Sequence, residues 1–226
     1  MKTLVILFGT GELPKTIWSY LTYAARGQYE VIAFTCDAEY IPETGRFMDL
    51  PVVAFEKPRL DNFIGDAPVK FCLPVGYRQM NRLKERKYFQ AKEWGYDFIS
   101  YVHPTVNLFP DSKIGENVII LENNTVQPGV TIGNSCVIWS NNHIGHGSRI
   151  GSCSWLASGI IISGGCTIGE RVFMGVNSCL RDGIEIADDT LIGMGAVITK
   201  STESASVYLA GANRKYTGKK SDEVEI

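Results

Sequence analysis

The central and C-terminal parts of the chain follow a strict six-residue pattern of apolar and polar positions. Every sixth residue from Val102 to Ile198 is Val, Ile, Leu or Met, seventeen positions without an interruption. A period of six is not a whole number of α-helical turns and is too long for simple strand alternation. The pattern therefore predicts short strands joined by tight turns, with the aliphatic side chains pointing inward.

Two further columns accompany this repeat. The residue after the aliphatic one is Gly at positions 115, 133, 145, 151, 169, 175 and 193, and the residue four after it is small or β-branched nearly throughout. We interpret the glycines as residues that tolerate the dihedral angles of a turn, and the small residues as packing a corner. Three hexads would close a triangular coil, so the repeat predicts a parallel β-helix of five to six coils. A β-sandwich would need turns every 8–12 residues and gives no reason for strict sixes.

Residues 1–100 have a different pattern. The apolar run Leu4–Phe8 is typical of a strand buried on both faces, and a helix is expected between Pro14 and Gly27. Further strands are expected at 31–34, 51–55 and 69–75, and a charged helix at 79–94. Alternating strands and helices predict a small Rossmann-like parallel α/β sheet. The expected organisation is an α/β domain (1–100), a β-helix domain (101–203) and a tail (204–226).

Candidate ligand contacts lie where the α/β strands end, because parallel sheets bind ligands at that edge. Gly9-Thr10-Gly11 is half of a dinucleotide-binding fingerprint. It is either a tight turn or a loop whose N–H groups contact a phosphate. Asp37 ends the second strand and either accepts a hydrogen bond from a ribose or base or is solvated. Gly76 and Tyr77 follow a later strand.

Composition narrows the function classes. Lys and Arg total 22 against 24 Asp and Glu, a net charge of −2 that argues against a nucleic-acid binder. The apolar runs are far shorter than the ~20 residues of a membrane helix, and no cleavage pattern of a signal peptide follows Met1, so we expect a cytoplasmic protein. Six Cys without a CxxC pair predict reduced thiols. Of 23 Gly, 14 lie between residues 115 and 195, within the repeat.

Only three His residues are present, at 103, 143 and 146. A neutral imidazole suits the removal of a proton from an amine or hydroxyl that attacks a thioester. His143 and His146 lie on either side of the inward Ile144 and are the candidates for this role, although each could also be a solvated side chain. His103 precedes Pro104 and is interpreted as structural. A zinc site of the γ-carbonic anhydrase kind is disfavoured by the three-residue spacing of His143 and His146, so no metal is expected.

The order of a small α/β domain and an [aliphatic]-Gly-x-x-[small]-x prism resembles the sialic-acid O-acetyltransferase and nucleotide-amino-sugar N-acetyltransferase family. The resemblance implies a left-handed coil, a nucleotide-sugar on the α/β domain, acetyl-CoA on the prism, and a homotrimer with sites between subunits. The Gly-x-x-Gly-His turn of the family corresponds to Gly9-Thr10-Gly11-Glu12, without the His. Its second-strand acid matches Asp37, and its Gly-Asn pair matches Gly76-Tyr77.

The same resemblance implies roles in the prism. His146 occupies the position of the catalytic base, and the acid that follows it in the family is replaced by Gly147. Asn142, His143 or a residue of a neighbouring subunit could orient the imidazole instead. The thioester-side His of the family corresponds to Trp155, whose indole could cover the pantetheine arm. The resemblance places further contacts with CoA, made largely through the backbone, at Val176 and Met194. Arg214 and Lys215 either meet a CoA phosphate or belong to a solvated basic tail.

We therefore expect acetyl transfer from acetyl-CoA to an amine of a nucleotide-linked amino sugar, with a His general base and backbone N–H groups stabilising the oxyanion. The size of the acyl group is left open. The alternative within the class is O-acetylation of a sugar such as sialic acid. Outside it, the alternatives are a γ-carbonic-anhydrase-like metalloenzyme and a non-catalytic nucleotide-sugar-binding scaffold. A homotrimer is expected because Trp139, Trp155 and Phe173 would lie exposed on the prism walls.

Overall fold

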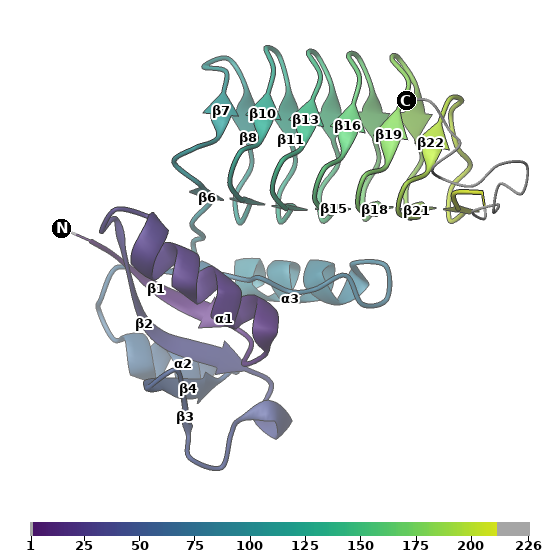
Figure 1. Cartoon of the computed structure of the whole chain (residues 1–226). Coiled ribbons are helices and arrows are strands. Elements are labelled where there is room, and N and C mark those ends of the chain that lie inside the picture. The colour runs from purple at the N-terminus through teal and green to yellow at the C-terminus, as the bar shows by residue number, and fades with distance from the viewer. Residues whose placement is uncertain (1, 212–226) are drawn as a thin grey trace, which may run out of the picture.

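The computed structural model describes residues 2–211. A small α/β domain forms the N-terminal part, and a three-sided prism of stacked two-residue strands follows it (Figure 1). The predicted architecture, a Rossmann-like parallel sheet followed by a left-handed parallel β-helix, is confirmed.

The α/β domain is built on one five-stranded sheet with the order β3-β4-β2-β1-β5. All neighbouring strands are parallel except β3 and β4. The strands are β1 (Thr3–Phe8), β2 (Tyr29–Cys36), β3 (Arg46–Phe47), β4 (Leu50–Ala54) and β5 (Val69–Cys72). The helices are α1 (Glu12–Ser19), which continues as a π-helical turn (Tyr20–Ala24), a 3-10 turn (Ala38–Tyr40), α2 (Lys57–Ile64) and α3 (Arg82–Glu93).

Both faces of this sheet are covered. On one side, Ile17 and Leu21 of the first helical segment pack in one apolar cluster with β1 residues such as Leu7. On the other side, Leu60 of α2 and Tyr88 of α3 share a cluster with other residues of the sheet. The sequence did not indicate α2 or the short β3. The predicted helix at 79–94 begins only at Arg82, because residues 79–81 have positive φ angles of 55°, 49° and 62° and form a left-handed turn.

The prism has three faces, which we number in the order in which the chain first reaches them. Face 1 contains β6 (Tyr101–Val102), β9 (Ile119–Ile120), β12 (Val137–Ile138), β15 (Trp155–Leu156), β18 (Phe173–Met174), β21 (Leu191–Ile192) and β23 (Val207–Tyr208). Face 2 contains β7 (Asn107–Leu108), β10 (Thr125–Val126), β13 (His143–Ile144), β16 (Ile161–Ile162), β19 (Cys179–Leu180) and β22 (Val197–Ile198). Face 3 contains β8 (Lys113–Ile114), β11 (Thr131–Ile132), β14 (Arg149–Ile150), β17 (Thr167–Ile168) and β20 (Glu185–Ile186).

Each strand pairs with the strand 18 residues further on, as three hexads per coil require; Ile138 pairs with Leu156, and Leu156 with Met174. The second residue of each strand points inward and belongs to one continuous apolar core. The small or β-branched residues four positions later are also buried, from Val118 to Ala196. Both predicted columns of buried residues are therefore confirmed.

The explanation that the sequence suggested for the glycines after the inward residues is wrong. These glycines do not have positive φ angles; they lack space for a side chain, because a Cβ on Gly175 would lie 2.5 Å from the backbone nitrogen of Met194 in the next coil. The left-handed backbone lies two residues later, at the third residue after each inward aliphatic from Ile114 to Ile192; Gly147, for example, has a φ of 66°. Close packing of consecutive coils, rather than turn geometry, selects the first glycine column.

The α/β domain lies against face 1, and α3 runs along the prism (Figure 1), from Glu85, which pairs with Arg171 just before β18, to Lys92, which pairs with Glu116 just before β9. One apolar cluster joins Leu7 and Ile17 of the α/β domain to Ile119, Val137 and Trp155 of face 1. Trp155 is only 6% exposed, and Trp139 and Phe173 are half-buried against the same cluster. The expectation that these aromatic residues form an exposed wall is therefore wrong: the chain's own N-terminal domain packs against this wall.

The prism continues past residue 203, where the sequence placed the end of the β-helix domain. β23 pairs with β21 in face 1, but Ile192 and Tyr208 are 16 residues apart instead of 18. The last coil is shorter by two residues, so its strand falls out of the six-residue phase.

Candidate functional site

The predicted nucleotide contacts lie after β1, β2 and β5. These three strands are neighbours in the sheet. Gly9 has a φ of 102°, and a Cβ there would lie 2.6 Å from Cγ of Pro14. Only glycine fits this turn, so the chain can reverse directly into α1. Thr10, Gly11, Asp37, Gly76 and Tyr77 follow carboxyl ends of parallel strands, the edge at which such sheets bind ligands.

Asp37 has a partner that the sequence did not reveal. Its carboxylate forms an ion pair with Nζ of Lys87, a residue of α3. The ammonium group also lies 5.0 Å from the ring centre of Phe55 and 5.6 Å from that of Phe8. The pair places a cation and an anion together at the ligand edge of the sheet. Lys87 is one of many charged residues in its helix, and only the docking of α3 distinguishes it.

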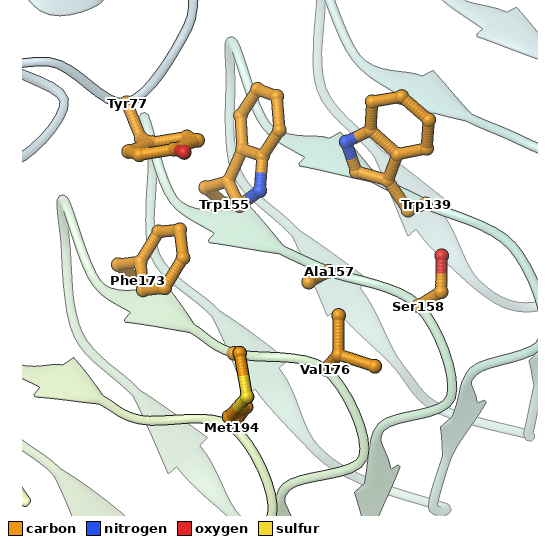
Figure 2. A pocket seen from close by; sticks show the side chains of 9 residues that line it. Tyr77, Trp139, Trp155, Ala157, Ser158, Phe173, Val176 and Met194 are labelled. Carbon is orange, nitrogen blue, oxygen red and sulfur yellow. The ribbon is translucent and has the colours of Figure 1, made fainter. Parts of the chain in front are cut away.

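A cavity of about 360 Å³ lies at the corner between faces 1 and 2, which we call corner 1/2. The structure brings together there four residues selected from the sequence, Tyr77, Trp155, Val176 and Met194. The remaining lining residues, which the sequence did not select, are Trp139, Ala157, Ser158, Phe173 and Gly175. Figure 2 shows Tyr77, Trp155 and Trp139 along one side, Phe173 beside Tyr77, and Val176 and Met194 on the opposite side. The cavity therefore joins the end of the α/β sheet to the prism.

The aromatic end of the cavity is packed closely. The ring of Tyr77 lies 5.1 Å from that of Trp155 and 4.7 Å from that of Phe173, and the rings of Trp155 and Trp139 are 6.0 Å apart. At the other end, the backbone N–H groups of Val176 and Met194 donate to no acceptor within residues 2–211. These two amides are therefore available to a ligand.

A buried lysine lies against the aromatic end of the cavity. Lys84 of α3 is 0% exposed, donates a hydrogen bond of 3.2 Å to the carbonyl of Ser154, and lies 5.7 Å from the ring centre of Trp155. Burial lowers the pKa of Lys84 to about 8, because removal from water disfavours the charged form. Lys84 does not line the cavity but contacts Trp155 and the residue before it.

His143 and His146 lie away from this cavity. His143 is half-buried on face 2, and His146 is exposed at the next corner, which we call corner 2/3. The backbone N–H of His146 donates to Oε1 of Gln127, but neither imidazole is hydrogen-bonded within residues 2–211. Within one chain, His146 and the cavity thus lie at opposite edges of face 2.

The imidazole of His146 is positioned by contact with the next coil. A Cβ on Gly164 would lie 2.5 Å from Cε1 and Nε2 of His146, so the ring occupies the space that this glycine leaves open. Sequence reasoning missed Gly164, although its place 18 residues after His146 is the signal for a contact between coils. Asn142 does not orient the ring, because its Oδ1 accepts from the N–H of Ile160 and its Nδ2 donates to the carbonyl of Trp139.

His103 lies at the domain junction, where its Nδ1 is 2.9 Å from Oγ1 of Thr105 and its ring is 5.8 Å from that of Tyr20. Between residues 2 and 211, no group of three or more His, Cys, Asp or Glu is arranged to hold a metal ion. None of the helices in this same part of the chain is long and apolar enough to cross a membrane. Arg214 and Lys215 lie outside the described residues.

Two solved structures share this arrangement along nearly the whole chain. The acetyltransferase domain of PglB from Neisseria gonorrhoeae is 19% identical, with a TM-score of 0.77 over 92% of this chain and 97% of that one. PerB from Caulobacter crescentus, solved with CoA and GDP-perosamine, is 22% identical, with a TM-score of 0.77 over 91% and 93%. This chain has the fold of those two acetyltransferases.

Other comparisons agree with this fold. WeeI from Acinetobacter baumannii is 14% identical and matches with a TM-score of 0.54 over 92% of this chain and 97% of that one. The family model of the GMPPB C-terminal domain matches residues 99–210, which form the prism. No curated protein matches the chain in sequence. The resemblance inferred from the repeat and the domain order is thereby confirmed at the level of the fold.

Proposed function

We propose that the protein is an acyl-CoA-dependent transferase that acylates an amine of a nucleotide-linked amino sugar, with His146 as the general base. The observation that carries this proposal is the cavity at corner 1/2, where Tyr77 at the ligand edge of the α/β sheet meets the free amides of Val176 and Met194. One site thus contacts both parts of the chain. The fold shared with PerB, which was solved with CoA and a GDP-linked sugar, supports the same assignment.

The reaction needs one proton acceptor. The lone pair of the sugar amine attacks the thioester carbonyl, the new C–N bond forms, and the C–S bond breaks to release CoA. His146 Nε2 or Nδ1 accepts the proton that the amine loses, and the proton then passes to the departing sulfur. Free backbone N–H groups at the cavity, such as those of Val176 and Met194, are suited to stabilise the oxyanion formed at the carbonyl.

His146 reaches such a site only from another copy of the chain. The outward residues of face 2 include Ile161, which is 45% exposed, and Val197, which is 68% exposed. If face 2 of three prisms turns toward a common threefold axis, corner 1/2 of each prism adjoins corner 2/3 of the next. This closed arrangement buries the apolar residues and brings the partner's His146 beside the cavity. We therefore propose a homotrimer with three shared sites.

Release of CoA, followed with a thiol reagent against UDP-, GDP- and dTDP-linked amino sugars, tests the reaction. We expect one acceptor to be used and His146→Ala to lower kcat by about 10² to 10⁴-fold. His103→Ala, at the domain junction, is the matched control and should retain activity. Resistance of the product to hydroxylamine distinguishes an amide from the ester of O-acylation. Turnover with none of these acceptors, or full activity of His146→Ala, would refute the proposal.

Two further variants test the geometry. Gly164 has no positive φ, and the three atoms nearest to a Cβ added there all belong to the His146 ring, so we expect Gly164→Ala to displace this ring and to lower kcat at least about tenfold with the fold intact. Mixing His146→Ala with Val176→Arg tests the shared site, because random mixed trimers would contain about one intact site in four. Recovery of about a quarter of the native activity supports the trimer, and no recovery contradicts it.

A further inference from the structure

The ring of His146 has no hydrogen-bond partner in the part of the chain that the structure describes. An imidazole acts as a base through one ring nitrogen, and the group that accepts a hydrogen bond from the other nitrogen fixes which one that is. The residue after His146 is Gly147, and the amide of Asn142 is engaged with the backbone on both sides. The cavity that a second copy would bring beside the ring has no charged residue in its lining. The orienting acceptor is therefore expected along the corner of His146 itself.

Corner 2/3 repeats every 18 residues, so equivalent residues of consecutive coils lie next to one another. The N–H of Gly165 donates to the carbonyl of His146, and the N–H of Gly183 donates to the carbonyl of Gly164. These bonds and the pairing of the preceding strands place His146, Gly164 and Asp182 at the same position of three consecutive coils. Asp182 is thus two coils beyond the proposed base, with a glycine between them.

The imidazole of His146 already spans the first of these two steps. The three atoms nearest to a Cβ on Gly164 would be Cε1, Nε2 and Nδ1 of His146, at 2.5, 2.5 and 3.0 Å. The ring therefore extends from its own coil toward the coil of Asp182. A side chain at position 164 would fill this path, so the glycine leaves the space between the base and the carboxylate open.

Asp182 can reach the ring by rotation of its own side chain. Neighbouring coils are about 4.8 Å apart, the spacing of paired strands. The bond lengths of an extended Asp side chain place its carboxylate oxygens about 3.5 Å from Cα. Directed along the corner, the carboxylate therefore comes within hydrogen-bond distance of a ring that occupies the space beside Gly164.

Little holds the carboxylate of Asp182 elsewhere. Its side chain is 79% exposed, and within residues 2–211 its one ion pair is with Arg181, which is 65% exposed and whose Nε lies 3.8 Å from Oδ1. Exposed pairs of this kind contribute little to stability. The other carboxylate of this corner, that of Asp111, accepts from the N–H of Gly129 and lies two coils before His146, on the side away from which the ring extends.

We propose that Asp182 is the positioning residue of this base, and that its carboxylate accepts a hydrogen bond from one ring nitrogen of His146 across Gly164. The other ring nitrogen then keeps its lone pair for the amine proton, and the carboxylate stabilises the imidazolium that forms. The proton passes on to the departing sulfur, so Asp182 stays ionised throughout. The inference rests on the proposed function, because it completes the general base of that reaction.

Nitrogen-15 NMR of the histidine-labelled full chain tests the contact without any substrate. The chain has three His residues, so the His146 signals are identified by their loss in His146→Ala. We expect one tautomer of the His146 ring in native protein and a mixture of both in Asp182→Ala, which removes the acceptor. Glu185→Ala removes a carboxylate from an exposed position of face 3 and should leave the tautomer unchanged. The same mixture in native protein and Asp182→Ala would overturn the proposal.

Kinetics with the acceptor found in the CoA-release assay test the consequence for catalysis. Asp182→Ala should lower kcat at least about tenfold and change KM by less than about twofold, because the base is misoriented while substrate contacts remain. Asp182→Glu, which retains a carboxylate, should restore most of this kcat. In a His146→Ala background, Asp182→Ala should have no further effect.

The outcomes separate this inference from the proposed function. Full kcat of Asp182→Ala beside an impaired His146→Ala, or no recovery in Asp182→Glu, would overturn the role of Asp182 and leave the transferase intact. Turnover with no acceptor would refute the proposed function, and the tautomer comparison would still decide whether Asp182 orients the ring.

Discussion

Faces 1 and 2 of the prism are built from the same repeat, yet the described chain covers only one of them. On face 1, the outward residues Ile119 and Val137 are buried beneath the α/β domain, together with Trp155. On face 2, the outward residues Ile161 and Val197 remain exposed. The inward residues of both faces belong to one core.

The comparison shows that the outward residue of each strand decides what a face does. Face 3 confirms the rule, because its outward positions are polar, including the exposed Lys113, Arg149 and Glu185. Face 1 is covered by the chain's own α/β domain, and the polar outward residues of face 3 are typical of a solvent-exposed surface. Only face 2 combines exposed apolar residues with a candidate catalytic group, so it is the face on which assembly and catalysis would meet.

The strongest test places a charge on face 2. Ile161→Arg should prevent association and lower activity by at least about 100-fold, because an unpaired charge at the proposed threefold interface is costly to desolvate. Light scattering after size exclusion and CoA release measure the two effects. Thr167→Arg, at an exposed position on face 3, should assemble like the native protein and stay active. An active, assembled Ile161→Arg variant would show that face 2 is not the interface.

A second prediction concerns the buried contact on face 1. The pKa of Lys84 is about 8 in the folded chain, below its unfolded value of about 10.4, so between these pH values the unfolded chain binds more protons. Stability contributed by this site therefore rises with pH across that window. The unfolding free energy of Lys84→Met relative to native protein should decrease by up to about 3 kcal/mol from pH 7.5 to 10.5.

Urea unfolding at the two pH values measures this difference, and groups common to both proteins cancel. Lys92→Met removes a half-exposed lysine of the same helix and is the matched control. A pH-independent difference for Lys84→Met would mean that water reaches its ammonium group, and that face 1 is less tightly sealed than the packing indicates.

The smallest expected effect is a count of reactive thiols. Cys179 lies half-buried on face 2, whereas the other five cysteines are buried. Burial raises the pKa of Cys136 to about 11 and that of Cys153 to about 12, which keeps these thiols unreactive. If the native protein forms the proposed trimer, it should show no fast thiol. The Ile161→Arg variant should show one, and the double variant Ile161→Arg, Cys179→Ser should again show none. One fast thiol in native protein would contradict a covered face 2.

Much of the fold could be predicted from the repeat. The inward column from Val102 to Ile198 lies in the core as expected, because a coil of three hexads returns each such residue to the same wall. The α/β pattern was also visible, apart from α2. The explanation given for the glycines after the inward residues was wrong. A sequence pattern shows that these positions have no side chain, but it does not show whether a positive φ angle or a lack of space requires glycine there.

The candidate site was only partly visible in the sequence. Tyr77, Trp155, Val176 and Met194 were selected for separate reasons and line one cavity. Lys87 and Gly164 were missed, since each acts through a contact with a distant segment: the first pairs with Asp37, and the second leaves space for the His146 ring. Such contacts carry no local signature.

By itself, the sequence determined the coil, because a period of six in apolar residues fits one regular way of burying them. It also determined the order of the two parts. Only the tertiary structure decided which face the α/β domain covers, and hence that Trp155 belongs to a cavity wall while Ile161 stays exposed. That choice depends on the joint fit of surfaces distant in sequence. It leaves His146 and the cavity on opposite edges of face 2. We propose that a second copy of the chain completes the site by bringing its own His146 beside this cavity.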